Sequence, residues 1–124
     1  MTATSLEPTP SDLVALAVSG AAPALRLTAV GEVDSSSAPL LRKHLDAVLD
    51  GDNVSELTID LDGVTFLDSA GLCVLAAAHR RAVKDGVRLR VLASSRAVIR
   101  PLQITGLWDL LGVEKVEPGG GSAV

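Results

Sequence analysis

The chain has 124 residues and a mass of 12.7 kDa, which is a natural size for a single domain. Its formal net charge of -4 and pI near 5.0 disfavour a nucleic-acid-binding protein, because such proteins usually present a basic face. Hydrophobic residues make up 48% of the chain but aromatic residues only 2%, so the core must be built from Leu, Val, Ile and Ala.

The two ends of the chain lack the periodic apolar residues found between them. Residues 1–11, with two prolines, are predicted to form a flexible leader, and residues 117–124, "EPGGGSAV", a disordered glycine-rich tail. A single domain is therefore expected over residues 12–116. No apolar run approaches the length of a membrane span and no signal segment is found, so we expect a cytoplasmic protein with no membrane partner.

Two strands and a helix are predicted first along the chain. Residues 13–20 and 24–33 show strand-like alternation, and the short connection between them indicates an antiparallel pair. A helix follows within "DSSSAPLLRKHLDAVLDG". Ser and Asp stand at its start, Pro39 falls in its first turn and Gly51 lies just past its end.

Strands and helices alternate in the rest of the chain. Residues 56–61 are predicted as a strand, "DGVTF" as a turn with a short extended piece, and "AGLCVLAAAHRRAVKDG" as a helix that ends at Gly86. Residues 88–93 form another strand, "SSRAVIRPLQITGLWDLLG" a helical region interrupted by Pro101, and "VEKVE" fits a short final strand. This order implies parallel pairing through right-handed crossovers. The predicted fold class is α/β: a small mixed β-sheet with an antiparallel N-terminal pair and parallel strands joined by helices.

Loops that follow successive parallel strands lie on one edge of such a sheet, where ligands and partners usually bind. The loops at 31–37 and 66–71 are expected to share that edge, which places Asp34 and Ser35 near Asp68 and Ser69. Val74, in the helix after Ser69, falls on the predicted outer side, where a single exposed apolar residue is normal and a docking surface beside the shared edge is the second interpretation. Projection at about 100° per residue predicts which side chains of this helix face the sheet: Leu72, Leu75, Ala76, His79 and Val83.

Ser69, in "FLDSAGL", has three interpretations. Serine and aspartate are favoured helix caps, each worth roughly 1 kcal/mol. A nucleophile is disfavoured, because Leu67 stands where the pattern G-x-S-x-G needs glycine and because His44 and His79 are predicted to lie away from the serine. Modification is feasible, because a helix N-terminus tolerates a phosphate, which would add about -1.5 to -2 charges to an edge that already carries two aspartates.

No metal site and no cofactor site are predicted. Two histidines and one cysteine stand at unrelated spacing, and "GGGS" near the end of the chain lacks the strand, helix and lysine of a phosphate-binding loop. The lone cysteine, Cys73, lies in an apolar run and is expected to be a small buried side chain.

Three segments, "GEVDSSSAPLLRKHL", "LTIDLDGVTFLDSAGLCVL" and "LQITGL", together resemble the STAS-domain family, and specifically its stand-alone bacterial anti-sigma factor antagonists. The resemblance implies a protein that is not an enzyme and that binds an anti-sigma factor, itself a serine kinase, to release a sigma factor. It implies that the kinase phosphorylates Ser69, that the phosphorylated form loses binding, and that a phosphatase restores it. It also implies a partner-binding surface that includes Asp34, Ala70, Gly71 and Val74.

One departure from the family pattern concerns the residue after the serine. Many members carry a second hydroxyl residue there, whereas this chain has Ala70, so Ser69 is the only acceptor in the motif. The family also contains stressosome subunits and lipid-transport accessory domains. The alternative prediction is therefore a STAS scaffold that binds a partner in a signalling or lipid-transport assembly without being phosphorylated.

Overall fold

The computed structural model describes residues 13–118. The predicted leader and most of the predicted tail lie outside the described residues. The helices and strands are, in chain order, β1 (Val14–Ala21), β2 (Ala24–Val33), α1 (Ala38–Asp50), β3 (Glu56–Leu67), α2 (Ser69–Asp85), β4 (Arg88–Ala93), α3 (Arg96–Ile104), α4 (Leu107–Leu111) and β5 (Glu114–Lys115).

The five strands of the described chain form one sheet in the order β1-β2-β3-β4-β5. β1 and β2 pair antiparallel, and the remaining neighbours pair parallel through the helices that connect them. The predicted fold class is therefore confirmed. Because β2, β3 and β4 run in the same direction, the loops that follow them meet at one edge of the sheet.

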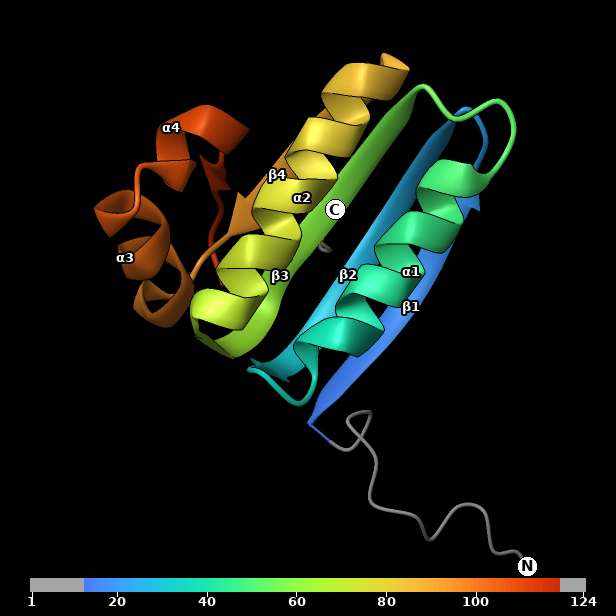
Figure 1. Ribbon diagram of the computed structural model, residues 1–124. Coiled ribbons are helices and arrows are strands. Elements are labelled where there is room, and N and C mark those ends of the chain that lie inside the picture. The colour runs from blue at the N-terminus through green and yellow to red at the C-terminus, as the bar shows by residue number, and fades with distance from the viewer. Residues whose placement is uncertain (1–12, 119–124) are drawn as a thin grey trace, which may run out of the picture.

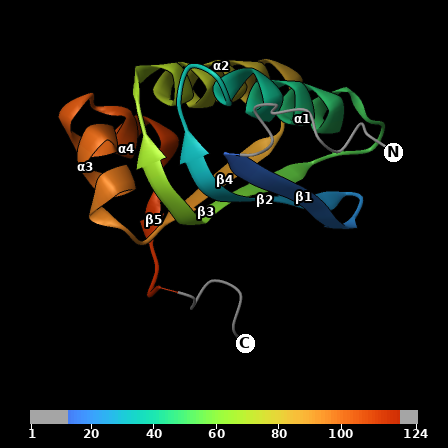
Figure 2. The ribbon, with the colours of Figure 1, turned by 90° about the horizontal axis from the view of Figure 1, so that it is seen from below.

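The helices cover one face of the sheet. α1 and α2 lie side by side over it, and α3 and α4 lie beside β4 and β5 (Figures 1 and 2). On the opposite face Arg26 donates a hydrogen bond of 2.6 Å to Asp60, whose side chain is almost fully buried. A buried carboxylate needs a partner of opposite charge, and Arg26 supplies it here.

The core lies between the sheet and the helices and is almost entirely aliphatic, as the composition predicted. Each fully buried side chain of this kind contributes about 1.5–3 kcal/mol relative to an exposed one. The largest are Leu27, Leu41, Leu45, Leu57, Ile59, Leu61, Leu75 and Leu102.

The predicted turn at "DGVTF" is wrong, because β3 continues through it to Leu67. The pairing with β2 instead shifts register twice, between Thr28 and Val30 and between Gly31 and Glu32. A Cβ at Gly63 would lie 2.8 Å from a Val30 side-chain atom, so the glycine allows Val30 to pack over β3. Asp-Gly is a turn signal in sequence, but here it marks an irregular strand pair with a close approach.

The predicted sheet-facing side of α2 is also wrong in part. Val83 is 67% exposed, whereas Ala78 and Ala82 are buried. Leu72 and Leu75 are buried as predicted, but the buried side also includes Gly71, Val74, Ala78 and Ala82, so it is shifted from the predicted orientation. Small residues let α2 approach its neighbours closely, and a projection weighted towards large apolar side chains does not detect such a surface.

Candidate functional site

The two loops predicted to share a sheet edge do adjoin. Val33 and Leu67 are paired at the ends of β2 and β3, and the backbone N–H of Asp68 donates to the Val33 carbonyl at 3.2 Å. Asp34 and Asp68 therefore follow two residues that sit directly opposite each other in the sheet. The crossover topology brings the predicted partner-binding residues of both loops to one place.

Asp68, and not Ser69, caps α2. Its Oδ1 accepts hydrogen bonds from the backbone N–H groups of Ala70 at 2.9 Å and Gly71 at 3.3 Å. Ser69 is the first residue of the helix and is exposed, and its hydroxyl makes no hydrogen bond to any described residue. The capping interpretation thus holds for the aspartate alone, which leaves the serine hydroxyl accessible.

The Asp34 carboxylate organises the loop before α1. Its Oδ1 accepts hydrogen bonds from the Ser36 hydroxyl at 2.7 Å, the Ser36 N–H at 2.8 Å and the Ser37 N–H at 3.1 Å. The side-chain and backbone hydrogen bonds of Ser36, followed by those of Ser37, hold the pKa of Asp34 below its usual value. This carboxylate therefore stays ionised at neutral pH, and the loop presents Ser35 to solvent.

Ser37 is a structural residue that sequence reasoning missed. It is fully buried, and its Oγ donates to the Glu32 carbonyl at 2.8 Å and accepts from the Asp34 N–H at 2.9 Å. The run "DSSS" carries the only signal for this arrangement, since Asp and Ser side chains commonly bond the backbone of a turn.

Gly71 sets how closely α2 approaches the sheet. A Cβ there would lie 2.4 Å from Leu67 Cδ1 and 2.8 Å from Val33 Cγ1. Ala70 beside it is half-buried. The first turn of α2 is therefore packed directly on the ends of β2 and β3, which fixes Ser69 relative to the Asp34 loop.

The prediction that Val74 lies on the outer side of α2 is wrong. Its side chain is only 8% exposed because α1 packs beside α2. Val74 nevertheless lines a groove of about 480 Å³ between these helices, together with Ser35 from the Asp34 loop. Cys73 also lines the groove and is exposed, so its predicted burial is wrong as well.

Two arginines on this groove could not be identified from the sequence. Arg42 comes from α1 and Arg80 from α2, and both side chains line the groove that contains Ser35 and Ala70. No local pattern links positions 42 and 80, because only the packing of α1 against α2 brings them together.

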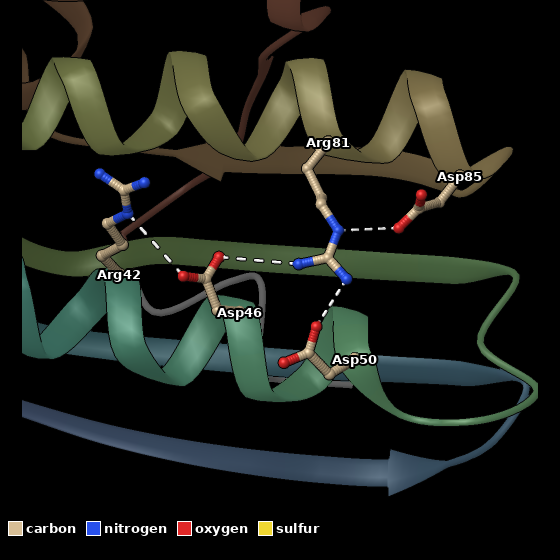
Figure 3. Close-up of polar contacts among 5 residues, drawn as sticks. All are labelled: Arg42, Asp46, Asp50, Arg81 and Asp85. Atoms are coloured by element: carbon tan, nitrogen blue, oxygen red, sulfur yellow. Dashed lines mark hydrogen bonds and ion pairs between the residues drawn. The ribbon is translucent and has the colours of Figure 1, made fainter.

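A network of ion pairs joins α1 to α2 further along the helices (Figure 3). Arg81 on α2 contacts Asp50 on α1 at 2.6 Å, Asp85 at 2.8 Å and Asp46 at 3.9 Å. Hydrogen bonds to Asp50 and Asp85 raise the pKa of Arg81 above its usual value. The network holds α1 against α2, and the first turns of these two helices carry the site.

The two histidines of the chain are not placed as a base for Ser69. His44 Nδ1 lies 3.0 Å from the Leu40 carbonyl oxygen of its own helix, and His79 is ten residues further along α2 than the serine. Within residues 13–118, no group of three or more His, Cys, Asp and Glu side chains is placed to hold a metal ion. None of the helices in that range is long and apolar enough to cross a membrane.

Known proteins share this fold and sequence pattern. The family model described as the STAS domain matches residues 15–119. The anti-sigma-B factor antagonist of Bacillus subtilis (strain 168) is 32% identical over 96 residues, which cover 77% of this chain and 86% of that protein. A crystal structure of an anti-sigma factor antagonist from Mycobacterium paratuberculosis is 31% identical, with a TM-score of 0.75 over 86% of this chain and 89% of that chain.

A third similarity concerns the fold alone. The structure of the anti-sigma factor antagonist SpoIIAA in its unphosphorylated form is 17% identical, with a TM-score of 0.71 over 82% of this chain and 88% of that chain. The chain belongs to the STAS domain family, which confirms the resemblance drawn from its motifs.

Proposed function

We propose that this chain is an anti-sigma factor antagonist that works as a phosphorylation switch in the cytoplasm and catalyses no reaction itself. Unphosphorylated, it binds an anti-sigma factor that is a serine kinase, and so releases a sigma factor. Phosphorylation of Ser69 ends this binding, and a phosphatase restores it. Membership of the STAS family and the names of relatives at 31% and 32% identity support this proposal.

The exposure of Ser69 is the observation that carries the proposal. A kinase can reach a hydroxyl that no described residue bonds, at the first position of a helix. Asp68 already occupies the N–H groups of Ala70 and Gly71, so a phosphate on Ser69 remains at the surface beside a carboxylate. Modification thus changes the charge of the edge without a need to unfold the helix.

The surrounding charges explain how a phosphate would block binding. Asp34 and Asp68 lie on the same edge, and hydrogen bonds keep the pKa of Asp34 low. A further charge of about -1.5 to -2 raises the cost of desolvating this edge against a partner that accepts the neutral hydroxyl. The partner surface proposed for this switch is Asp34, Ser35, Asp68, Ala70, Gly71 and Val74, with Val74 forming part of the groove floor.

Mapping the phosphate tests the acceptor. After incubation with ATP and the cognate kinase, mass spectrometry is expected to place one phosphate on Ser69, and Ser69→Ala should abolish it. Ser19→Ala serves as the control, because Ser19 is an exposed serine in β1 outside the proposed partner surface and its loss should leave the modification intact. A phosphate on Ser35 or Ser36 would show that the acceptor has been assigned wrongly.

Calorimetry with the kinase separates the switch from the scaffold alternative. Ser69→Asp is expected to bind at least tenfold more weakly, which corresponds to about 1.4 kcal/mol. Ser69→Ala should bind as wild type does, because the hydroxyl has no partner among the described residues. Equal affinities for the two variants would favour a STAS scaffold that works without phosphorylation.

A further inference from the structure

A second pocket, of about 350 Å³, lies between α3 and β5. It shares no lining residue with the groove between α1 and α2. We call it the basic pocket, because three of its six lining side chains are cationic and none is acidic, in a chain whose net charge is -4. The residues that line it are Ser94, Arg96, Ile99, Arg100, Gln103 and Lys115.

One face of α3 supplies most of the basic pocket. Four of the lining residues stand at positions i, i+3, i+4 and i+7 of this helix and so share one side of it. Val98 and Leu102 are buried and attach the helix to the core. Arg96 and Arg100 are like charges one turn apart, an arrangement that slightly disfavours a helix unless an anion compensates for it.

The three cations of the basic pocket have no acidic partner within residues 13–118. Elsewhere in the described chain, Arg26, Arg42, Arg81 and Arg90 each form an ion pair with Asp or Glu, whereas Lys43, Arg80, Lys84 and Arg88 form none but do not gather around one pocket. No ion pair is found for Arg96, Arg100 or Lys115 there. Their positive charge is therefore available to a ligand.

The start of α3 is tied to β3 near Ser69. The Ser94 hydroxyl donates to the Asp62 carbonyl at 3.3 Å, and the Ser95 hydroxyl donates to the Val64 carbonyl at 3.2 Å. Val64 precedes the last residue of β3, Leu67, by three residues, which is roughly 10 Å along a strand, and Ser69 begins α2 two residues later. Figure 2, viewed from below, shows α3 beside the arrow end of β3.

A single partner protein can cover both the surface around Ser69 and the basic pocket. A typical protein interface buries about 800 Å² on each partner, which corresponds to a patch roughly 30 Å across. The length of chain from Val64, which Ser95 contacts, to Ser69 is about half of that. A protein that binds around Ser69 therefore reaches the basic pocket without any change in the fold.

We propose that the basic pocket binds an acidic segment of the protein that docks on the Ser69 edge. The identity of that protein rests on the proposed function. Arginine pairs carboxylates in a two-pronged geometry, and exposed cations around an open pocket suit Asp and Glu side chains on a partner surface. Such a contact gives orientation and speeds association, and it weakens as salt is added.

Association kinetics with the purified cognate kinase test this proposal. The variant Arg96→Gln/Arg100→Gln is expected to associate about tenfold more slowly at low salt, with the difference shrinking near 1 M salt. The matched control is Lys84→Gln/Arg88→Gln, which removes two exposed positive charges from the far ends of α2 and β4. Its association rate should stay within about twofold of wild type, and circular dichroism should show that both variants are folded.

Two outcomes separate this proposal from the proposed function. If the pocket variant associates at the same rate as its control while Ser69→Asp still loses binding, the basic pocket has been assigned wrongly and the switch stands. If the wild type does not bind the kinase at all, the proposed function fails. In that event, a titration with a hexaglutamate peptide, followed by NMR, tests whether the basic pocket binds an acidic segment.

The peptide titration has its own expected result. Amide signals of residues 94–100, 102, 103 and 115 should shift in the wild type, and the shifts should be lost in Arg96→Gln/Arg100→Gln. Absence of shifts in the wild type would overturn the proposal. Equal shifts with inorganic phosphate at the same concentration would also overturn it, because they would assign the pocket to small anions.

Discussion

At the scale of single residues, Gly71 shows how one missing methyl group positions the site. We expect Gly71→Ala to lower the free energy of unfolding by about 1–2 kcal/mol, because the added Cβ overlaps Leu67 and Val33. Overpacking costs about 1–3 kcal/mol, and the better helix propensity of alanine returns up to about 1 kcal/mol. Urea denaturation measures the change. Ser69→Ala, two positions earlier and exposed, is the control and should stay within about 0.5 kcal/mol of wild type.

Asp34 predicts an effect of pH on stability. Its pKa is lowered in the folded protein, so its contribution to stability is present above the unfolded pKa and is lost as pH falls through the lower folded value. Asp34→Asn removes this contribution. The free energy of unfolding of the variant should therefore fall below that of wild type by the largest amount near neutral pH, and the difference should shrink in acid. Measurements of unfolding free energy against pH test this. A deficit of the same size at every pH would show that the carboxylate charge contributes nothing.

Ser36→Ala extends that test within the same loop. The Ser36 hydroxyl makes the largest contribution to the lowered pKa of Asp34, so its removal should raise that pKa towards the ordinary value. NMR titration of the Asp34 carboxyl group measures the shift. An unchanged titration midpoint would contradict the assigned role of this hydrogen bond.

The sequence predicted the site only where topology dictates it. Asp34 and Asp68 could be placed together because loops after neighbouring parallel strands must meet, and Val33 and Leu67 are indeed paired. The buried role of Ser37 and the two arginines of the groove depend on side-chain packing between segments far apart in sequence. No spacing rule along the chain encodes such contacts.

At the scale of elements, the ion pairs of Arg81 link α1 to α2. Arg81→Met should lower the melting temperature, because it leaves Asp46, Asp50 and Asp85 as neighbouring negative charges without their shared cation (Figure 3). Arg42→Met is the matched control, since Arg42 makes one longer contact, at 3.8 Å to Asp46. Arg42→Met should lower the melting temperature less, and the difference in melting temperature between the two variants should narrow at about 1 M salt. An equal loss for both variants would argue against the network.

The elements also show where periodicity fails. β2 and β4 were predicted with the bounds that the structure shows, because alternating side chains and clear ends define them. The Asp-Gly pair in β3 was misread because Gly63 serves the packing of Val30 and makes no turn. The orientation of α2 was misread in part because alanine and glycine supply half of its buried residues, and these residues are weak markers of a core.

At the scale of the whole molecule, the described residues enclose a complete aliphatic core. Its members run from Val14 in β1 to Val113 before β5. β2 and β3 end side by side, so one edge of the molecule carries the Asp34 loop and the start of α2, with α3 beside it (Figures 1 and 2). This arrangement allows a surface modification to change binding while the core stays as it is.

Trimming the chain tests whether the stability of this core depends on the two ends of the chain. Removal of residues 1–10 and 119–124 should leave the melting temperature nearly unchanged, because neither sequence offers periodic apolar residues to the core. The control is a deeper cut that removes residues 1–16. It deletes Val14, which is 2% exposed, and half-buried Leu16, and it breaks the pairing of β1 with β2. Thermal unfolding followed by circular dichroism should show a clear loss only for the deeper cut. A similar loss for the shorter cut would mean that residues outside 13–118 stabilise the domain.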